Sequence, residues 1–92
     1  MENLVRCRVR ATGRVQGVGF RYFAYMEAVH LGVTGYAYNQ SDGSVELELQ
    51  GRTSAVAALL MKIRKGNGFM RVEDLEIQEI PVKPEEKGFK MN

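Results

Sequence analysis

The chain has 92 residues, of which 45% are apolar and 26% charged, and its formal net charge is +2. This length fits one folded domain, and the composition excludes an intrinsically disordered chain. No apolar run approaches the roughly 18 residues of a membrane-spanning helix, and residues 1–6 lack the basic-then-apolar order of a signal peptide. We therefore expect a single cytoplasmic domain over residues 1–92 that does not act at membranes.

The first predicted element is a strand over residues 5–11. Its apolar residues alternate with Arg6, Arg8 and Arg10, which is the period of a strand with one buried face and one solvated face. No acidic residue occurs over residues 3–26, so this part of the chain is positively charged. Such a segment suggests an anionic partner, although the plainer explanation is a strand whose arginines pair with acids elsewhere in the fold.

A helix over residues 20–31 is expected next, after a turn rich in glycine. Its apolar residues follow helical spacing, and Gly32 provides a C-terminal stop. Two β-rich runs follow, at residues 33–38 and 45–49. The Asp-Gly dipeptide between them is a strong turn signal, so we expect these two strands to form a hairpin.

The second half of the chain predicts another helix and strand. The helix is expected from a cap at Thr53 or Ser54 to Gly66, because its apolar residues recur at i, i+3, i+4 and i+7. Residues 72–80 form the fourth predicted strand. Two prolines then interrupt regular structure, and residues 89–91 can add a short strand at an edge of the sheet.

The order strand, helix, strand, strand, helix, strand is typical of the ferredoxin-like α+β sandwich (βαββαβ), with two helices packed on one face of an antiparallel sheet. In that topology the first and third strands are central antiparallel neighbours. The arginines of the first strand are then expected to face Glu46, Glu48 and Gln50 on the open side of the sheet. Opposite charges across neighbouring strands stabilise each other, which explains the arginine row without any ligand.

The turn before the first helix has the features of a phosphate site. Its glycines allow backbone N–H groups to point inward, and the N-terminus of the helix adds positive potential. The turn lacks both the Lys-Ser/Thr of a Walker A loop and the third glycine of a dinucleotide loop, so a nucleotide site is not indicated. Arg21 lies in the first turn of the helix, where a cation opposes the helix dipole unless an anion lies between them. A guanidinium also binds phosphate oxygens bidentately.

Asn39 ends the second predicted strand beside the hairpin turn. Its neutral amide can hold a water molecule without repelling a phosphate, although Asn before Ser-Asp-Gly is also ordinary turn chemistry. The first and second strands are parallel in the expected topology, so their ends open on the same edge of the sheet. We therefore expect Arg21 and Asn39 to lie close together.

With these motifs the chain resembles the acylphosphatase family. Residues 13–21 are similar to its phosphate loop, residues 31–39 and 42–46 are similar to its second motif, and the likeness covers nearly the whole chain. The resemblance implies an acylphosphatase, a hydrolase that cleaves the carboxyl-phosphate bond of small-molecule acyl phosphates to carboxylate and inorganic phosphate, with phosphate also an inhibitor. It implies that Arg21 is the catalytic residue that binds phosphate and that Asn39 orients the attacking water.

The resemblance also implies a phosphate-binding backbone. Its residues are Val15, Gln16, Gly17, Val18, Gly19 and Phe20. Tyr38, residues 66–68 and the Met91-Asn92 ending depart from the family pattern. We expect these departures to affect substrate affinity and C-terminal packing rather than the reaction.

No metal or other cofactor is expected. Cys7 and His30 are the only cysteine and histidine, fewer than the three or four ligands of a zinc site. A carboxylate is a good leaving group, so the reaction that the resemblance implies needs no strong general acid. The single cysteine also excludes an internal disulfide.

Two alternatives stay open. One is a non-catalytic accessory domain that binds phosphate or carbamoyl phosphate, as in larger maturation proteins, and the presence of both Arg21 and Asn39 favours the enzyme over it. The other is a ferredoxin-like RNA-binding module, which is disfavoured because the predicted central strands carry charges and no aromatic residue. The net charge of +2 is also too small to indicate nucleic acid as a partner. We expect a monomer, since the pattern shows no self-complementary apolar patch.

Overall fold

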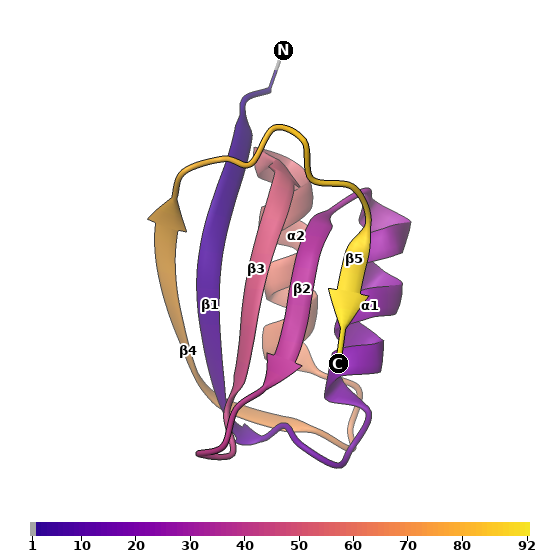
Figure 1. Cartoon of the computed structure of the whole chain (residues 1–92). Helices are drawn as coiled ribbons and strands as arrows, with labels where there is room; N and C mark the ends of the chain where they lie inside the picture. Colours follow the sequence, from indigo (N-terminus) through magenta and orange to yellow (C-terminus); the bar gives the residue numbers. More distant parts are fainter. Residues whose placement is uncertain (1) are drawn as a thin grey trace.

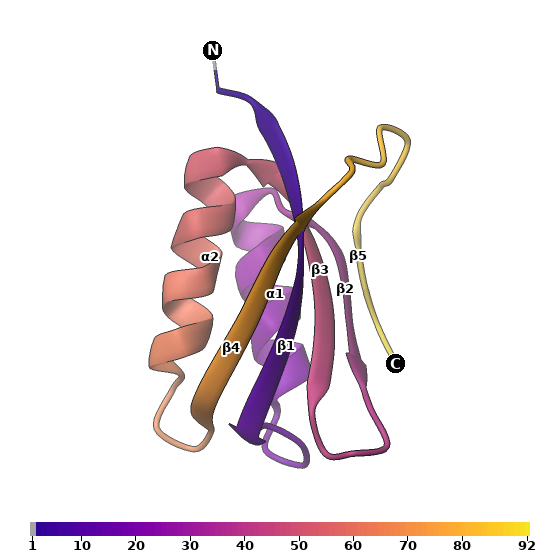
Figure 2. The same cartoon turned by 90° about the vertical axis from the view of Figure 1, so that its left-hand side faces the viewer.

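A computed structural model describes residues 2–92 of the chain (Figure 1). Its elements are β1 (Leu4–Arg14), α1 (Phe20–Leu31), β2 (Thr34–Asn39), β3 (Val45–Arg52), α2 (Thr53–Lys65), β4 (Arg71–Ile80) and β5 (Phe89–Met91). The strands form one sheet in the order β4-β1-β3-β2-β5. Both helices cover the same face of this sheet, so the predicted ferredoxin-like α+β fold is confirmed (Figure 2).

The sheet is mixed rather than wholly antiparallel as predicted. The four longer strands pair antiparallel, whereas the short edge strand β5 runs parallel to β2. The direction of β5 follows from the path of the chain, because residues 81–88 cross the sheet at the end where β4 stops and β2 starts (Figure 1). We call residues 81–88 the crossing segment.

The core lies between the sheet and the helices. Side chains that alternate along β1 and β3 meet the apolar stripes of α1 and α2 there. The apolar residues that are fully shielded from solvent are Val9, Ala11, Ala24, Ala28, Ala37, Val45, Leu47, Leu49, Leu59 and Ile63. The period-2 and helical patterns of the sequence therefore identify the buried faces correctly.

β1 is longer than the predicted strand over residues 5–11. It continues through Gly13 and Arg14, which pair with β4 beyond a register shift after Thr12. Gly13 has φ of 119°, and a Cβ atom there would lie 2.3 Å from the backbone oxygen of Arg71. A glycine is needed at this close approach of two strands, and the sequence pattern alone made it look like part of the turn.

The hydroxyl cap predicted for α2 is wrong. Arg52 is the N-cap residue, Thr53 is already helical, and no side chain of the N-cap residue caps the helix. The carboxylate of Glu2 instead accepts hydrogen bonds from the backbone N–H and the hydroxyl of Ser54, each at 2.9 Å. A carboxylate at this place also suits the positive end of the helix dipole, but it lies 52 residues away in sequence and has no local signal.

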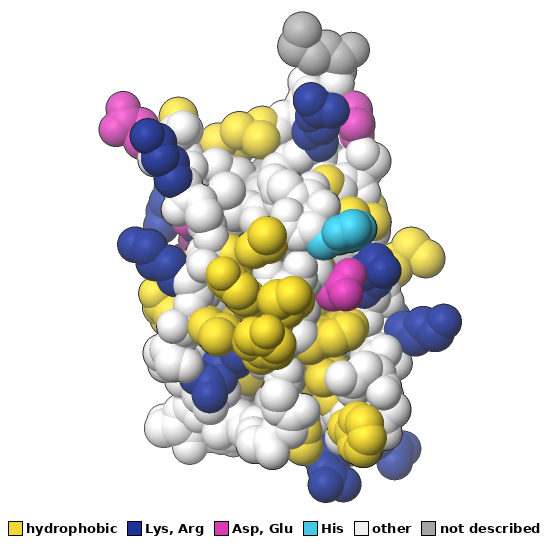
Figure 3. All heavy atoms as spheres, turned by 90° about the vertical axis from the view of Figure 1, so that its right-hand side faces the viewer, with side chains coloured by type: hydrophobic (Ala, Val, Ile, Leu, Met, Phe, Trp, Pro, Cys, Tyr) yellow, Lys and Arg dark blue, Asp and Glu magenta, His cyan; other side chains and the backbone are white. Residues whose placement is uncertain are grey.

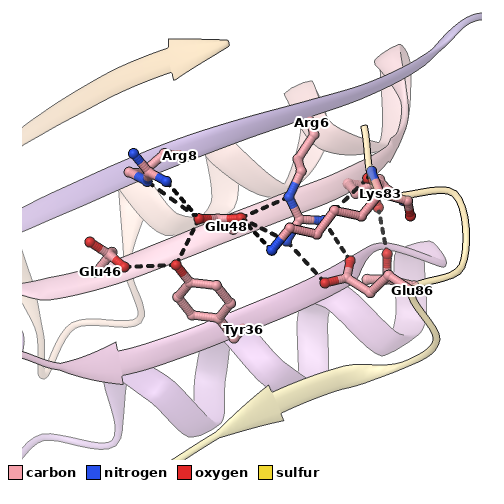
Figure 4. A network of polar contacts seen from close by, with 9 residues as sticks. Arg6, Arg8, Tyr36, Glu46, Glu48, Lys83 and Glu86 are labelled. Carbon is pink, nitrogen blue, oxygen red and sulfur yellow. Dashed lines mark hydrogen bonds and ion pairs between the residues drawn. The ribbon is translucent and has the colours of Figure 1, made fainter. Parts of the chain in front are cut away.

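The arginine row faces the predicted partners, but Arg6 is not solvated. In register, Arg6 lies opposite Gln50 and Arg8 opposite Glu48. The crossing segment covers Arg6, whose side chain is 0% exposed. The Arg6 guanidinium donates to Glu48 at 2.8 Å and to the two carboxylate oxygens of Glu86 at 2.7 and 3.0 Å (Figure 4).

Further polar contacts complete this network. Gln50 donates to the backbone oxygen of Lys83 at 2.8 Å and accepts from the Lys83 N–H at 2.7 Å, which fixes the crossing segment on β3. Burial raises the pKa of Glu48, but hydrogen bonds from Tyr36, Arg6 and Arg8 outweigh burial and lower it to about 2. Glu48 is therefore ionised in the folded protein over the whole neutral range.

Replacing Arg6 is expected to destabilise the fold strongly. Arg6→Met leaves the buried carboxylate of Glu48 and the partly buried carboxylate of Glu86 without their partner Arg6. Removing one member of a buried ion pair costs about 3–5 kcal/mol of unfolding free energy. The measurement is urea-induced unfolding at pH 7. Arg8→Met is the matched control, because Arg8 contacts the same carboxylate from a side chain that is 51% exposed.

The pH dependence gives this prediction a second readout. The pKa of Glu48 is about 2 in the folded protein against an ordinary value of 4.5, so the network stabilises the fold fully above pH 4.5 and loses its effect as the pH falls toward 2. The difference between wild type and Arg6→Met is therefore expected to shrink over this range. If Arg6→Met lowers the unfolding free energy at pH 7 no more than Arg8→Met does, the result would contradict the role of the network.

Candidate active site

The turn that joins β1 to α1 leaves the N-terminus of the helix open. Gly17 and Gly19 have φ of 73° and 79°, in the left-handed region that other residues rarely adopt. Gly19 is the N-cap residue, so no side chain of the N-cap satisfies the helix, and the first turn of α1 contains no acidic residue. Free N–H groups and the positive end of the helix dipole together favour an anion at this place.

Buried side chains anchor this turn at both ends. Val15 and Phe20 are each 1% exposed and belong to the core. Val18 packs partly against the same core. These anchors hold the backbone between them in place, so its N–H groups are arranged before any ligand binds.

The Gln16 side chain ties the turn to the hairpin between β2 and β3. Its Nε2 donates to the backbone oxygens of Gln40 and Ser44, each at 2.8 Å. The sequence suggested only a backbone role for Gln16. As the one polar side chain between the end of β1 and the start of α1 it was a visible candidate, but its partners lie 24 and 28 residues away.

Arg21 places its guanidinium beside the turn. The guanidinium donates to Asn92 Oδ1 at 2.7 Å and also to the backbone oxygen of Asn92. Both contacts come from one terminal nitrogen, Nη1. A guanidinium carries further N–H groups in the same plane, and with two of its nitrogens side by side it binds two oxygens of a phosphate or carboxylate. Nothing in the sequence pattern pointed to Asn92 as the residue that meets Arg21.

Asn39 lies at the end of β2 and meets the same residue. Its backbone N–H donates to Asn92 Oδ1 at 3.2 Å. Arg21 and Asn39 thus converge on one oxygen atom, as the parallel directions of β1 and β2 led us to expect. The side-chain Oδ1 of Asn39 is buried and has no hydrogen-bond partner within residues 2–92. A buried acceptor without a partner is costly, so a donor that binds here gains a favourable interaction.

A pocket of about 150 Å³ opens beside Arg21 and Asn92, and Asn39 is not among the residues that line it. It is lined by Val15, Gly17, Gly19, Phe20, Arg21, Tyr22, Met91 and Asn92. Four of the six residues predicted for the phosphate-binding backbone line it, whereas Gln16 turns to the hairpin and Val18 to the core. Since a water molecule takes about 30 Å³ in the liquid, the pocket has room for a small tetrahedral anion.

The acid of the hairpin turn is engaged elsewhere. Hydrogen bonds from Ser44 and Arg10 lower the pKa of Asp42, and its carboxylate lies 2.7 Å from the Arg10 guanidinium. Its charge is therefore balanced by Arg10. Within residues 2–92, no group of three or more His, Cys, Asp or Glu residues is placed to hold a metal ion, and no helix has the length and apolar character to cross a membrane.

Comparison with known proteins gives consistent matches. The family model described as acylphosphatase matches residues 7–91. The acylphosphatase of Clostridium beijerinckii is 43% identical over 94% of this chain and 96% of its own length, and that of Geobacillus thermodenitrificans is 45% identical over 94% of this chain and 92% of its own length.

Solved structures show the same similarity. The acylphosphatase from Bacillus subtilis superposes with a TM-score of 0.90 at 33% identity, over 96% of this chain and 98% of that one. Full-length HypF in its phosphate- and nucleotide-bound form also superposes with a TM-score of 0.90, at 27% identity. That match covers all of this chain and only 12% of the length of HypF.

Removing the Gln16 tether is expected to loosen the turn. Gln16→Ala loses two hydrogen bonds to backbone oxygens, which lowers the unfolding free energy by about 1–2 kcal/mol. Hydrogen exchange of the amides over residues 15–19 is expected to accelerate. Gln40→Ala is the control, because Gln40 Nε2 donates only to Tyr38 in its own hairpin. Equal exchange of these amides in both variants would show that Gln16 does not hold the turn.

Proposed function

This chain belongs to the acylphosphatase family and is an acylphosphatase, and from that premise we propose that Arg21 binds the phosphate of the substrate and Asn39 orients the water that attacks it. The observation that carries the proposal is the convergence of Arg21 and Asn39 on a single oxygen, Asn92 Oδ1, at an open helix N-terminus. Acyl phosphates are the substrates of this family, and phosphate is a product.

The phosphate binds where the oxygens of Asn92 now meet Arg21. The guanidinium bonds two phosphate oxygens, and the backbone N–H groups of the turn, from Val15 to Phe20, bond the others. Both kinds of donor concentrate positive charge around a group that carries two negative charges. Binding therefore requires the Asn92 oxygens to move aside, and the substrate phosphate offers Arg21 stronger, charge-assisted hydrogen bonds in exchange.

The water is held by Asn39. Its buried Oδ1 accepts a hydrogen bond from the water and its backbone N–H fixes the neighbouring phosphate oxygen. The water oxygen forms a bond to phosphorus while the bond from phosphorus to the acyl oxygen breaks. The carboxylate leaves with the bonding electrons, and the proton of the water passes to a phosphate oxygen.

The reaction so described depends on position and charge rather than on a titrating group. A carboxylate leaves readily without protonation, and phosphoryl transfer is accelerated mainly by alignment and by positive charge around the phosphoryl oxygens. Arg21 and the helix N-terminus supply that charge. We propose that this chemistry is metal-independent and uses no cofactor, that inorganic phosphate inhibits, and that residues 1–92 act as one domain and as a cytoplasmic monomer.

A non-catalytic phosphate-binding domain is the second candidate. The similarity to HypF in a phosphate-bound form supports it, because there a domain of this fold is a small part of a larger protein. An RNA-binding role is less well supported. Tyr36 and Tyr38 stack on the open face with ring centroids 4.5 Å apart. However, the single proton of the Tyr36 hydroxyl lies between the carboxylates of Glu46 and Glu48, at oxygen–oxygen distances of 2.7 and 2.8 Å, and these charges repel a phosphate backbone (Figure 4).

Substitution of the two proposed catalytic residues is expected to abolish most of the activity. Arg21→Gln is expected to lower kcat/KM by about 10³-fold or more, because it removes the charge that stabilises the transferring phosphoryl group. Asn39→Ala is expected to lower it by about 10²-fold, as loss of one positioned hydrogen-bonding group does elsewhere. The measurement is steady-state hydrolysis of benzoyl phosphate with a chelator present.

Arg14→Gln is the matched control. It makes the same change of charge at an exposed residue of β1 next to the turn, so near wild-type activity is expected. Full turnover in Arg21→Gln would contradict the proposed role. A folded wild type that binds inorganic phosphate but hydrolyses no acyl phosphate would instead favour the accessory domain.

A further inference from the structure

Hydrophobic side chains gather on the face formed by α1 and β5 (Figure 3). Tyr22, Met26 and Val29 on the helix are 57%, 48% and 56% exposed, and Met91 on β5 is 42% exposed. The sequence pattern had indicated no self-complementary apolar patch. Apolar side chains that gather on the surface of a small domain mark a place where a ligand or partner binds.

This apolar face is continuous with the pocket of the candidate active site. Tyr22 follows Arg21 in the chain and lines the same pocket, and Met91 lines it from β5 immediately before Asn92. Arg21 and Asn92, which meet at the proposed phosphate position, therefore each have an apolar neighbour in the chain that lines the pocket. The pocket is polar where Arg21 lies and apolar where Tyr22 and Met91 lie.

The ring of Tyr22 is supported from behind. Its centroid lies 6.3 Å from that of Tyr25, which in turn lies 6.3 Å from that of Phe89 on β5. Phe89 is 8% exposed, so this row of rings is anchored in the core. A supported ring loses little freedom when a flat group packs against it.

We infer that Tyr22 and Met91 form a platform for the acyl group, which makes this enzyme selective for acyl phosphates whose acyl group is aromatic. The inference rests on the proposed function, since it needs the phosphate at Arg21. An aromatic ring packs favourably on a tyrosine ring and against a methionine sulfur, and it offers both of them more apolar surface than an acetyl group does. The platform thus distinguishes substrates by the part that the phosphate site does not contact.

The test compares kcat/KM for benzoyl phosphate and acetyl phosphate. In Tyr22→Ala the kcat/KM for benzoyl phosphate divided by that for acetyl phosphate is expected to fall about five- to tenfold, mainly through a higher KM for benzoyl phosphate. Met91→Ala is expected to lower the same ratio by less. Tyr22→Phe keeps the ring and is expected to keep the ratio. Met61→Ala is the control, because Met61 is 73% exposed on α2 and does not line the pocket.

The outcomes separate the platform from the catalytic proposal. Hydrolysis of both substrates by the wild type with an unchanged ratio in Tyr22→Ala would overturn the platform and leave the proposed roles of Arg21 and Asn39 standing. No hydrolysis of either substrate by the folded wild type would overturn the proposed function and the platform with it. Urea unfolding of each variant shows whether a change in the ratio comes from the site or from a loss of structure.

Discussion

A buried guanidinium holds the two ends of the fold together. Arg6 comes from the central strand β1, and it binds Glu48 of β3 and Glu86 of the crossing segment, far away in sequence (Figure 4). An unpaired buried charge costs several kcal/mol, so Glu86 stays on Arg6 and the crossing segment stays on the sheet. β5 then follows beside β2 and brings Met91 and Asn92 to the pocket. An ion network on the open face of the sheet thereby determines what lies at the mouth of the site.

The direction of the strands supplies the second constraint. β1 and β2 both pair antiparallel with β3, so they are parallel to each other and end at the same edge of the sheet. The turn before α1 and the end of β2 therefore lie side by side, which places Arg21 near Asn39. A site built from a guanidinium and an amide acts through the positions and fixed charges of these groups rather than by taking up or giving off a proton. This agrees with a reaction whose leaving group needs no proton.

The sequence predicted the elements well and their long-range contacts less well. Helical spacing and the left-handed Gly32 define α1 locally, and its predicted bounds match the structure. The alternation along β1 predicted the pairing of its arginines with β3. The burial of Arg6 was missed because the residues that cover it lie some 80 positions away. The parts that Gln16 and Asn92 play in the site were missed for the same reason, since each depends on a contact between distant elements.

The most direct test of the site is a titration of the ¹⁵N-labelled protein with inorganic phosphate, followed by amide chemical shifts. If the turn and Arg21 bind phosphate, saturable shifts are expected at the amides of residues 15–20 and of Asn39, and they are expected to disappear in Arg21→Gln. A hollow on the open face, lined by Arg8, Arg10 and Glu76 among others, provides an internal comparison. Shifts that concentrate there and leave the turn unchanged would contradict phosphate binding at the turn before α1.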